Sequence, residues 1–487
     1  MANSKKKLHR REFLKNSCKI GVSASVVKAL GLSSLLHAQQ SLAAEQDYKA
    51  LVFIFLAGGN DSFNMIAPKG VGNLRTNYEN GRRNAAISAE QLNAITPKTD
   101  VKIYGGEQYN EFGLHPACAD MAEMFNNEEM SIVCNIGNLY EPTTRWQLLN
   151  DKVTLPPQLY SHSDQQLQFQ SQPDIPFRYG WGGRLAEMVE DFNSSSNVSP
   201  LISVSGLNSF QVASQPDVSA YVMGYDGAVK LNGVTNERKT LLESSIDSID
   251  ASSHLMLQKY RDVFNSAKKS EAIVTSAFTE AEQTGVDYDA MFTAAGANTS
   301  KIGRQLKTIA KMIAGRSSTG NNRPIYFVEM NGFDTHKKLL TNHQTLMTDL
   351  NAALKGFKDV LVAQGDFDKT LSFVGSEFGR TLTPNGNDAE FGTDHAWGGH
   401  ALLMGGMING GQMFGTHPDL KLKEGLDASS GRGRWIPTTS TSQCVAKIAN
   451  WFGVNQEELP LLIPSINNFP DTFTASSNLD FFKQEVS

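Results

Sequence analysis

The sequence is poor in cysteine: four of its 487 residues are Cys, at positions 18, 118, 134 and 444. No two of them have the CxxC spacing of a zinc ribbon, and four are too few for a disulfide framework in a chain of this length. A disulfide between Cys118 and Cys134 would suit an oxidising compartment. Buried free thiols explain the same residues equally well. The cysteines therefore exclude one class of metal site and leave one disulfide open.

The chain also lacks long apolar runs and, after residue 43, an excess of positive charge. Nothing beyond that point approaches about 18 consecutive apolar residues, so we expect no membrane span. Residues 1–43 contain eight Lys and Arg and one acidic residue. The remaining 444 residues contain 36 basic and 49 acidic side chains, a net charge of −13. This balance disfavours binding to phosphate-backbone polymers, so nucleic acid is not an expected partner.

The first 43 residues resemble an export signal rather than part of a fold. Lysines at 5–7 and the run RREFLK at 10–15 form a twin-arginine n-region, a mildly apolar stretch follows at 22–36, and small residues at 41–43 suit cleavage. We therefore expect a twin-arginine signal peptide at 1–43 and a periplasmic or secreted protein. The twin-arginine translocase is the expected partner during export, and this route moves folded proteins that often carry a metal already.

Apolar runs typical of strands alternate with helical periodicity along the rest of the chain. Buried strands are expected at 49–57, 131–136, 201–204, 324–330 and 371–374, and helices at 115–125, 303–315 and 343–364. The alternation predicts an α/β protein with a doubly wound, mostly parallel sheet. Between 206 and 297 the sequence is polar, Ser-rich and helical in period. We expect one domain at 44–487, with a helical insertion at 206–297.

Carboxylates and imidazoles follow several of the expected strands. The carboxyl ends of parallel strands meet at one edge of a sheet, where α/β proteins place their ligands. Carboxylate with neutral imidazole is the ligand mixture of Zn²⁺ and Mn²⁺, and Mg²⁺ takes the carboxylates. Because Asp394 and His395 are adjacent, one is expected to ligate while the other orients a ligand or binds a second ion. The candidate metal ligands are Asp61, Asp334, His336, Glu377, Asp394 and His395.

Three further residues are candidates for catalysis. Ser161 precedes a helix start in SHSDQQ, where backbone N–H groups favour an anion or a nucleophilic oxygen, although an ordinary helix cap explains it as well. Arg380 could hold a phosphate or sulfate oxygen, or could pair with a carboxylate. His400 could be a remaining ligand or the acid that protonates a leaving group.

Several segments together resemble one known family. They are LVFIFLAGGNDSFNMIAP at 51–68, SHSDQQ at 161–166, NGFDTH at 331–336, SEFGRT at 376–381 and GTDHAWGGH at 392–400, followed by LLMGG and GGQMFG. In this order they are similar to the domain-of-unknown-function 1501 family, relatives of the alkaline phosphatase and sulfatase superfamily. The resemblance implies a three-layer α/β/α fold and a centre of one or two divalent metal ions, Zn, Mn or Mg, near a Ser nucleophile.

The resemblance also implies roles for individual residues. Asp61 resembles the metal aspartate after the first strand, and Asp334 with His336 resembles the Asp and His of one metal site. Ser161 stands where the nucleophile would be. Phe378 stands where many members of the superfamily have a histidine ligand, so a second metal site would need Asp394 or His395 instead.

Two classes of function follow from these observations. The first is an exported metal-dependent hydrolase of small phosphate or sulfate esters that uses Ser161 as a metal-activated nucleophile. The alternative is a metal-binding or assembly protein that uses the same fold without turnover, and the missing ligand at Phe378 favours it. A weaker third hypothesis is a structural protein that binds a protein partner through 206–297.

Overall fold

A strand buried on both faces, β1 (Ala50–Ala57), lies in the middle of a nine-stranded sheet. The computed structural model describes residues 48–171, 178–215, 218–225, 227 and 235–484, and residues 49–487 form one compact unit. The strand order is β13-β7-β12-β11-β1-β10-β8-β9, with β14 paired to β7. The other strands are β7 (Met130–Gly137), β8 (Leu201–Ser203), β9 (Tyr221–Val222), β10 (Ile325–Asn331), β11 (Thr370–Gly375), β12 (Gly399–Met404), β13 (Met413–Phe414) and β14 (Thr439–Ser440).

Most of the strand pairs are parallel. β1 pairs in parallel with β10, with Leu51 opposite Ile325, and with β11, with Leu51 opposite Leu371. β12 is antiparallel to both of its neighbours, β11 and β7. The continuous apolar sequence of β1 is explained by this position, because a central strand contacts side chains on both faces. The predicted α/β fold with a mostly parallel sheet is confirmed.

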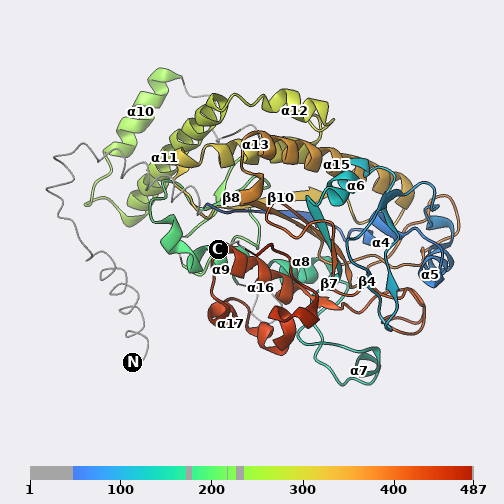
Figure 1. The fold of residues 1–487 in the computed structure, drawn as a ribbon. Coiled ribbons are helices and arrows are strands. Elements are labelled where there is room, and N and C mark those ends of the chain that lie inside the picture. Colours follow the sequence, from blue (N-terminus) through green and yellow to red (C-terminus); the bar gives the residue numbers. More distant parts are fainter. Residues whose placement is uncertain (1–47, 172–177, 216–217, 226, 228–234, 485–487) are drawn as a thin grey trace, which may run out of the picture. The chain divides into compact units, whose positions relative to one another are not determined.

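Helices cover both faces of the sheet (Figure 1). On one face α13 packs on β10 and on α15, and α6 packs on β7; on the other, α9 packs on β8 and α16 on β14. The first group comprises α6 (Ala119–Asn126), α10 (Asn236–Asp247), α11 (Leu255–Gln283), α12 (Tyr288–Ala294), α13 (Lys301–Ala314) and α15 (Leu339–Ala363), with the short α14 (Arg316–Thr319) beside them. The second comprises α8 (His162–Ser171), α9 (Trp181–Met188), α16 (Thr441–Phe452) and α17 (Leu459–Leu462). The predicted three-layer α/β/α architecture is therefore confirmed.

An aromatic cluster fixes α8 and α9 to the sheet. Phe53 of β1 stacks on Phe373 of β11 at 5.5 Å between ring centroids and on Phe169 of α8 at 6.1 Å. Trp181 at the start of α9 lies 5.7 Å from Phe53 and donates its indole N–H to the Phe169 carbonyl oxygen at 3.1 Å. Burying aromatic rings of this size stabilises the fold by roughly 1.5–3 kcal/mol each. The cluster sets where α8 begins, and the candidate site depends on that position.

The expected insertion at 206–297 contains β9 and the helices α10, α11 and α12. The helical period expected within 206–297 corresponds to α10, α11 and α12. Whether this segment is an insertion with edges at 206 and 297 stays a prediction, and the expected signal peptide at 1–43 lies outside the described residues.

Short elements complete the fold. Two small sheets, β2 with β3 and β6 and β4 with β5, precede β7. Their strands, with the remaining short helices, are β2 (Ile66–Pro68), β3 (Asn93–Ile95), β4 (Val101–Lys102), β5 (Gln108–Tyr109), β6 (Phe112–Leu114), α4 (Ser62–Met65), α5 (Asn73–Arg82) and α7 (Arg145–Leu149). Of the cysteines in the described ranges, Cys118, Cys134 and Cys444 are buried free thiols. None of the described helices has the length and apolar character needed to cross a membrane.

Candidate metal centre

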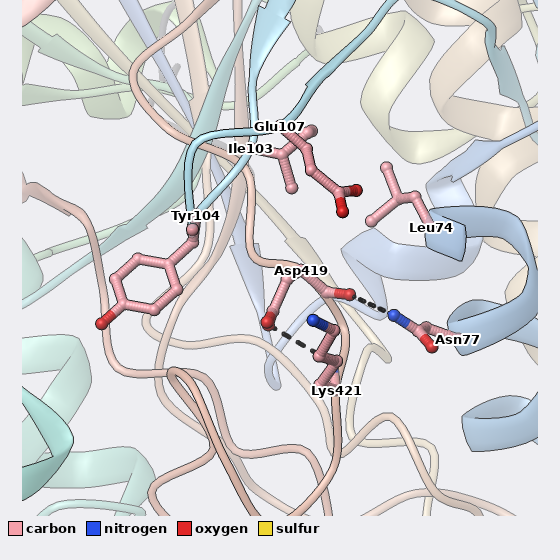
Figure 2. Close-up of a pocket in the computed structure, with 8 residues that line it drawn as sticks. Leu74, Asn77, Ile103, Tyr104, Glu107, Asp419 and Lys421 are labelled. Carbon is pink, nitrogen blue, oxygen red and sulfur yellow. Dashed lines mark hydrogen bonds between the residues drawn. The ribbon is translucent and has the colours of Figure 1, made fainter. Parts of the chain in front are cut away.

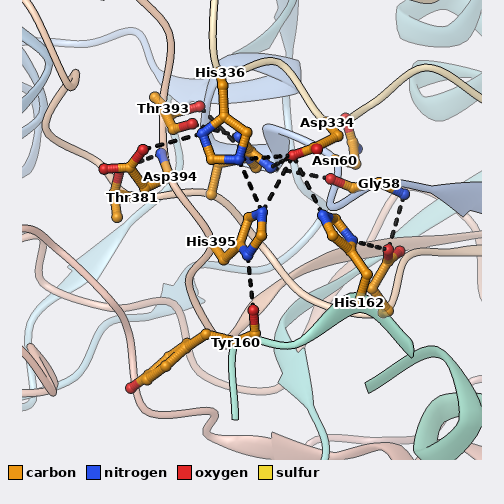
Figure 3. Close-up of polar contacts among 12 residues, drawn as sticks. Gly58, Asn60, Tyr160, His162, Asp334, His336, Thr381, Thr393, Asp394 and His395 are labelled. Atoms are coloured by element: carbon orange, nitrogen blue, oxygen red, sulfur yellow. Dashed lines mark hydrogen bonds and ion pairs between the residues drawn. The ribbon is translucent and has the colours of Figure 1, made fainter. Parts of the chain in front are cut away.

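Three histidine rings and one carboxylate converge beyond the carboxyl ends of the central strands (Figure 3). Asp334 Oδ1 lies 3.0 Å from His336 Nε2 and 3.2 Å from His395 Nε2. The same oxygen lies 3.3 Å from His162 Nε2. His336 Nε2 and His395 Nε2 are 2.9 Å apart. We call His162, Asp334, His336 and His395 the histidine cluster.

The sheet order explains why these residues meet. β11, β1 and β10 are adjacent and parallel, so the loops that follow them emerge at one edge. Asp334 and His336 follow β10, and Glu377 follows β11. His395 lies in a short segment that pairs with the residues after Glu377, through the Gly379 N–H to Trp397 carbonyl bond of 3.0 Å. The remaining member, His162, is the first residue of α8.

Each histidine has its Nδ1 atom engaged by an oxygen acceptor. His162 Nδ1 lies 2.9 Å from Glu377 Oε1, and His336 Nδ1 lies 3.1 Å from Asp394 Oδ1. His395 Nδ1 lies 2.7 Å from the Tyr160 carbonyl oxygen. Carboxylates and carbonyls only accept hydrogen bonds, so Nδ1 carries the proton in all three rings. The Nε2 atoms of the neutral rings therefore present lone pairs to one another.

This arrangement suits a bound cation. Lone pairs of His336 and His395 at 2.9 Å, facing a carboxylate oxygen, repel one another unless a proton or a metal ion lies between them. Protonating all three rings would instead place three positive charges side by side. The Nε2 atom of His162 is buried, and among the described residues it has a 3.3 Å approach to Asp334 Oδ1 but no hydrogen bond of good geometry. A metal ion would satisfy this orphaned nitrogen and the repelling lone pairs together.

The dimensions and chemistry of the histidine cluster fit such an ion. Tetrahedral Zn²⁺ with bonds of about 2.0–2.1 Å places its ligand atoms roughly 3.3 Å apart. The distances from Asp334 Oδ1 to the three Nε2 atoms, 3.0 to 3.3 Å, are close to that value. The ligand atoms of His162, Asp334 and His395 all lie within 4.8 Å of one another, a group of the described residues that does not include His336. Three imidazoles favour a transition ion such as Zn²⁺ over Mg²⁺, which prefers oxygen ligands. In metal sites, the ring nitrogen of a histidine that does not bind the ion usually donates its N–H to an oxygen acceptor, as Nδ1 of each cluster histidine does here.

A buried arginine keeps the central carboxylate ionised. Arg380 Nη1 donates to Asp334 Oδ1 at 2.7 Å and to the Gly58 carbonyl oxygen at 3.1 Å. Burial alone would raise the pKa of Asp334, but the hydrogen bond and charge of Arg380, together with His336 and His162, lower it to about 2. Asp334 is therefore a carboxylate at any physiological pH.

The pKa values of two cluster histidines move in opposite directions. The hydrogen bond to Glu377 raises the pKa of His162, against the opposing effect of burial. Burial lowers the pKa of His395, which favours the neutral ring that a metal ligand needs. A proton at His162 is thus the main competitor of an incoming ion.

The side chain of Phe378 packs against the rings of His162 and His395 and holds them in place. Its ring centroid lies 4.9 Å from that of His162 and 5.0 Å from that of His395. The other side of Phe378 meets Gly59, where a Cβ atom would lie 2.4 Å from the ring. Gly59 also has φ +80, which disfavours other residues. Phe378 therefore packs two cluster histidines in the place where the resemblance suggested another ligand.

Comparisons with known proteins establish the family. The profile of a family described as "Protein of unknown function (DUF1501)" matches residues 48–429. The chain belongs to the DUF1501 family. No curated protein sequence matches this DUF1501 chain.

Three solved structures are similar to this DUF1501 protein. One is the PsFucS1 sulfatase from Pseudoalteromonas sp., with 10% identity over 91% of this chain and 75% of that chain and a TM-score of 0.34. Another is Ps i-CgsB, with 9% identity over 86% of this chain and 77% of that chain and a TM-score of 0.32. A mutant of the alkaline phosphatase PafA has 11% identity over 69% of this chain and 63% of that chain, with a TM-score of 0.23. These scores are low, so the description of the fold rests on the strand order of the chain itself.

Six of the candidate residues predicted from the sequence lie at the cluster of the DUF1501 protein, and one of them is Arg380, which donates to Asp334 Oδ1. Asp334, His336 and His395 belong to the cluster itself. Glu377 and Asp394 contact it as the acceptors of histidine Nδ1–H groups, with no contact to the Nε2 side. The structure thus separates the six predicted metal ligands into three that converge, two that orient, and Asp61.

Asp61 and His400 lie elsewhere. Asp61 is buried in an ion pair with Arg82. His400 is buried on β12, where its ring stacks on His417 at 5.1 Å and lies 4.6 Å from Phe63. Burial and the neighbouring His417 lower the pKa of His400 well below its usual range, so its ring is neutral. None of the contacts described for these two residues involves the histidine cluster.

The two other catalytic candidates have their polar atoms engaged by the protein. Ser161 Oγ donates to Asp164 Oδ2 at 2.6 Å and lies 3.2 Å from Ser163 Oγ. Arg380 is fully buried and bonds to Asp334, Gly58 and Thr393. Of the two roles considered for Arg380, pairing with a carboxylate is the one that the structure shows.

Sequence reasoning missed His162 and the carbonyl group of Tyr160. His162 stands inside the SHSDQQ segment, but the helix start drew attention to the serine before it. A histidine at the first position of a helix in a family segment was the available signal. No sequence signal marks a backbone carbonyl as a ligand support.

A small cavity of the DUF1501 protein lies apart from the cluster (Figure 2). It has a volume of about 40 Å³ and is lined by residues of α5, of the β4–β5 hairpin and of 419–421. Asn77 Nδ2 donates to the Asp419 carbonyl oxygen across one side at 2.8 Å. This volume holds one or two water molecules and no organic substrate.

Proposed function

We propose that this protein binds one divalent transition-metal ion, with Zn²⁺ as the first candidate, through His162, His336, His395 and Asp334. The observation that supports the proposal is the convergence of three Nε2 atoms on one carboxylate oxygen while every Nδ1 is fixed by an acceptor. We further propose that the site hydrolyses small anionic esters of phosphate or sulfate, the activity that the resemblance implies.

The charges at the site support an anionic substrate. Asp334, Glu377 and Asp394 contribute three negative charges, and Arg380 and Arg432, which pair with Asp334 and Asp394, contribute two positive ones. These five side chains have a net charge of −1, and a divalent ion changes it to +1. A positively charged site attracts anions and repels cations, including the basic groups of proteins that bind polyanions.

The exposure of the cluster supports access by a small molecule. The Asp334 side chain is 46% exposed and that of His336 is 42% exposed, whereas Glu377 behind them is fully buried. When bound, the ion would supply Lewis-acid chemistry toward an ester oxygen. The side chains around the cluster would hold the three imidazole rings in position and keep the Asp334 carboxylate ionised.

The second candidate is a metal-binding or assembly function without turnover. One observation favours it: Ser161 Oγ donates to Asp164, and Arg380 is buried in contacts with Asp334. Neither residue is thereby available as a nucleophile or as an anion clamp in this arrangement.

One set of variants separates these proposals. Purified protein is stripped of metal, loaded with zinc and assayed on an aryl phosphate, a phosphodiester and an aryl sulfate. Zinc binding that is lost in His162→Ala and Asp334→Ala, with zinc-dependent hydrolysis of an ester, supports the hydrolase. Zinc binding without any hydrolysis supports the non-catalytic candidate, and equal activity of Ser161→Ala removes the serine nucleophile. Absence of zinc binding in the wild type contradicts both.

We also propose export by the twin-arginine route, on the basis of the RREFLK run at 10–15. Replacing Arg10 and Arg11 by lysine should retain the protein in the cytoplasm. Unchanged export of this variant would contradict the proposal.

A further inference from the structure

A single loop places two arginines behind two of the cluster histidines. We propose that Arg432 and Arg434 are positioning residues that set the orientation of His336 and His395 toward the metal ion, acting through Asp394 and the Tyr160 carbonyl group. The inference rests on the proposed metal-binding function and assigns part of the geometry of that site to residues that do not touch the ion.

Arg432 acts on His336 through Asp394. Its Nη2 atom forms an ion pair with Asp394 Oδ2, and the other oxygen, Oδ1, accepts from His336 Nδ1 at 3.1 Å. Asn385 Nδ2 donates to the same Oδ1 at 3.3 Å. Asp394 is therefore fixed from both sides, and its free rotation would otherwise turn the ring of His336 with it.

Arg434 acts on His395 through Tyr160. Its guanidinium carbon lies 4.3 Å from the centre of the Tyr160 ring. Tyr160 has φ +74, a left-handed conformation that disfavours residues other than glycine. In this conformation the carbonyl points at His395 Nδ1, while the ring turns away from the cluster (Figure 3). The cation–π contact holds the Tyr160 ring and thereby helps to offset the backbone strain that presents the carbonyl.

The loop that carries both arginines is itself pinned. Its carbonyl groups at Arg432 and Gly433 accept from the N–H groups of Thr383 at 3.1 Å and Leu382 at 3.2 Å. Gly433 has φ +69, and a Cβ atom there would lie 2.5 Å from Leu382 Cβ. Ser429 Oγ accepts from the Arg432 N–H at 2.8 Å. The loop thus has little freedom, as a support for ligands requires.

The test compares loop variants with a matched control in the full-length protein. Arg432→Gln and Arg434→Gln remove the ion pair and the cation–π contact without removing a ligand. Arg145→Gln is the control, because Arg145 Nε donates to the Asp427 carbonyl of the neighbouring segment at 2.8 Å and none of its contacts among the described residues involves an acceptor of a cluster histidine. Zinc dissociation constants are measured by competition with a chelating dye, and coordination is read from the visible spectrum of Co²⁺-loaded protein.

Each loop variant should bind zinc about 10–100-fold more weakly than the wild type, and its Co²⁺ spectrum should shift. Arg145→Gln should match the wild type in both measurements. Arg432→Lys, which keeps the charge beside Asp394 but not the fork, should recover part of the affinity and also serves if Arg432→Gln does not fold. If the folded loop variants keep the zinc affinity and the Co²⁺ spectrum of the wild type, the positioning role of Arg432 and Arg434 is overturned, while the proposed metal site stands. Absence of zinc and cobalt binding in the wild type would overturn the proposed function and this inference together.

Discussion

Glu377 is the side chain whose replacement tests the account of the site in most detail. It is fully buried, and its Oε1 atom accepts from His162 Nδ1 at 2.9 Å, from the Gly58 N–H at 2.9 Å and from Gln166 Nε2 at 3.0 Å. Oε2 accepts from Ser376 Oγ at 3.0 Å. Glu377→Gln keeps an oxygen for the first three donors, and its new NH₂ group can donate to the hydroxyl of Ser376. The variant therefore removes the charge and little else.

The expected effects follow from that difference. Loss of a charged acceptor behind a metal-ligating histidine weakens metal binding about 10–100-fold, or about 1.4–2.8 kcal/mol. At 2.1 cal/mol/K per residue over residues 49–487, the entropy of unfolding is about 0.9 kcal/mol/K. The zinc-loaded variant should thus melt about 1.5–3 °C below the zinc-loaded wild type at the same free zinc. Glu377→Ala removes the acceptor of three donors, of which the Gly58 N–H is buried and those of His162 and Gln166 are part-buried, and should lower the free energy of unfolding of the metal-free protein by about 1–3 kcal/mol.

The assay is a zinc titration against a chelating dye, followed by thermal melting at fixed free zinc and urea unfolding of the metal-free protein. The reasoning predicts the order wild type, Glu377→Gln, Glu377→Ala for zinc affinity. Equal zinc affinity of wild type and Glu377→Gln would show that the carboxylate behind His162 does not support the site.

Three other predictions follow from the same structure. Phe378→Ala opens a void beside His162 and His395, and urea unfolding should show a loss of about 3–5 kcal/mol; a loss below about 1 kcal/mol would contradict this packing. Hydrogen bonding to Glu377 raises the pKa of His162, so protons should displace zinc from His162 as the pH falls from about 8 to 6. The zinc dissociation constant measured by competition should therefore increase over this range. A dissociation constant that does not change with pH would refute this prediction. His400→Gln should lower the free energy of unfolding by about 1–3 kcal/mol and leave zinc affinity unchanged, because His400 is buried away from the cluster. A loss of zinc affinity in this variant would show that His400 contributes to the metal site.

The sequence predicted the part of the site that follows buried strands. Strands β1, β10 and β11 are buried on both faces and appear as continuous apolar runs, so the expected ends at 57, 330 and 374 lie within one residue of the observed ones. Parallel pairing of these strands then places Asp334 and Glu377 at one edge of the sheet. This part of the site is set by local sequence and by a general rule of α/β folds.

The rest of the site depends on tertiary packing that local sequence does not express. His162 reaches the cluster because Phe169 of the same helix packs on Phe53, and nothing near residue 162 reports that contact. His400 misled the prediction because it follows the same glycine-rich loop as His395, yet it lies on β12, where a register irregularity occurs between Gly399 and Ala401. Its ring consequently packs into the core. Antiparallel β12 was itself not predicted, since it begins with a glycine that follows another glycine and has the polar His400 as its second residue.

The most direct test of the central claim is the metal content of the protein recovered after export, measured by elemental analysis alongside His162→Ala. The account predicts one equivalent of a transition metal per chain, zinc first among the candidates, and a large loss in the variant. A wild-type chain without bound metal, or a variant that keeps the full equivalent, would contradict the histidine cluster as a metal centre.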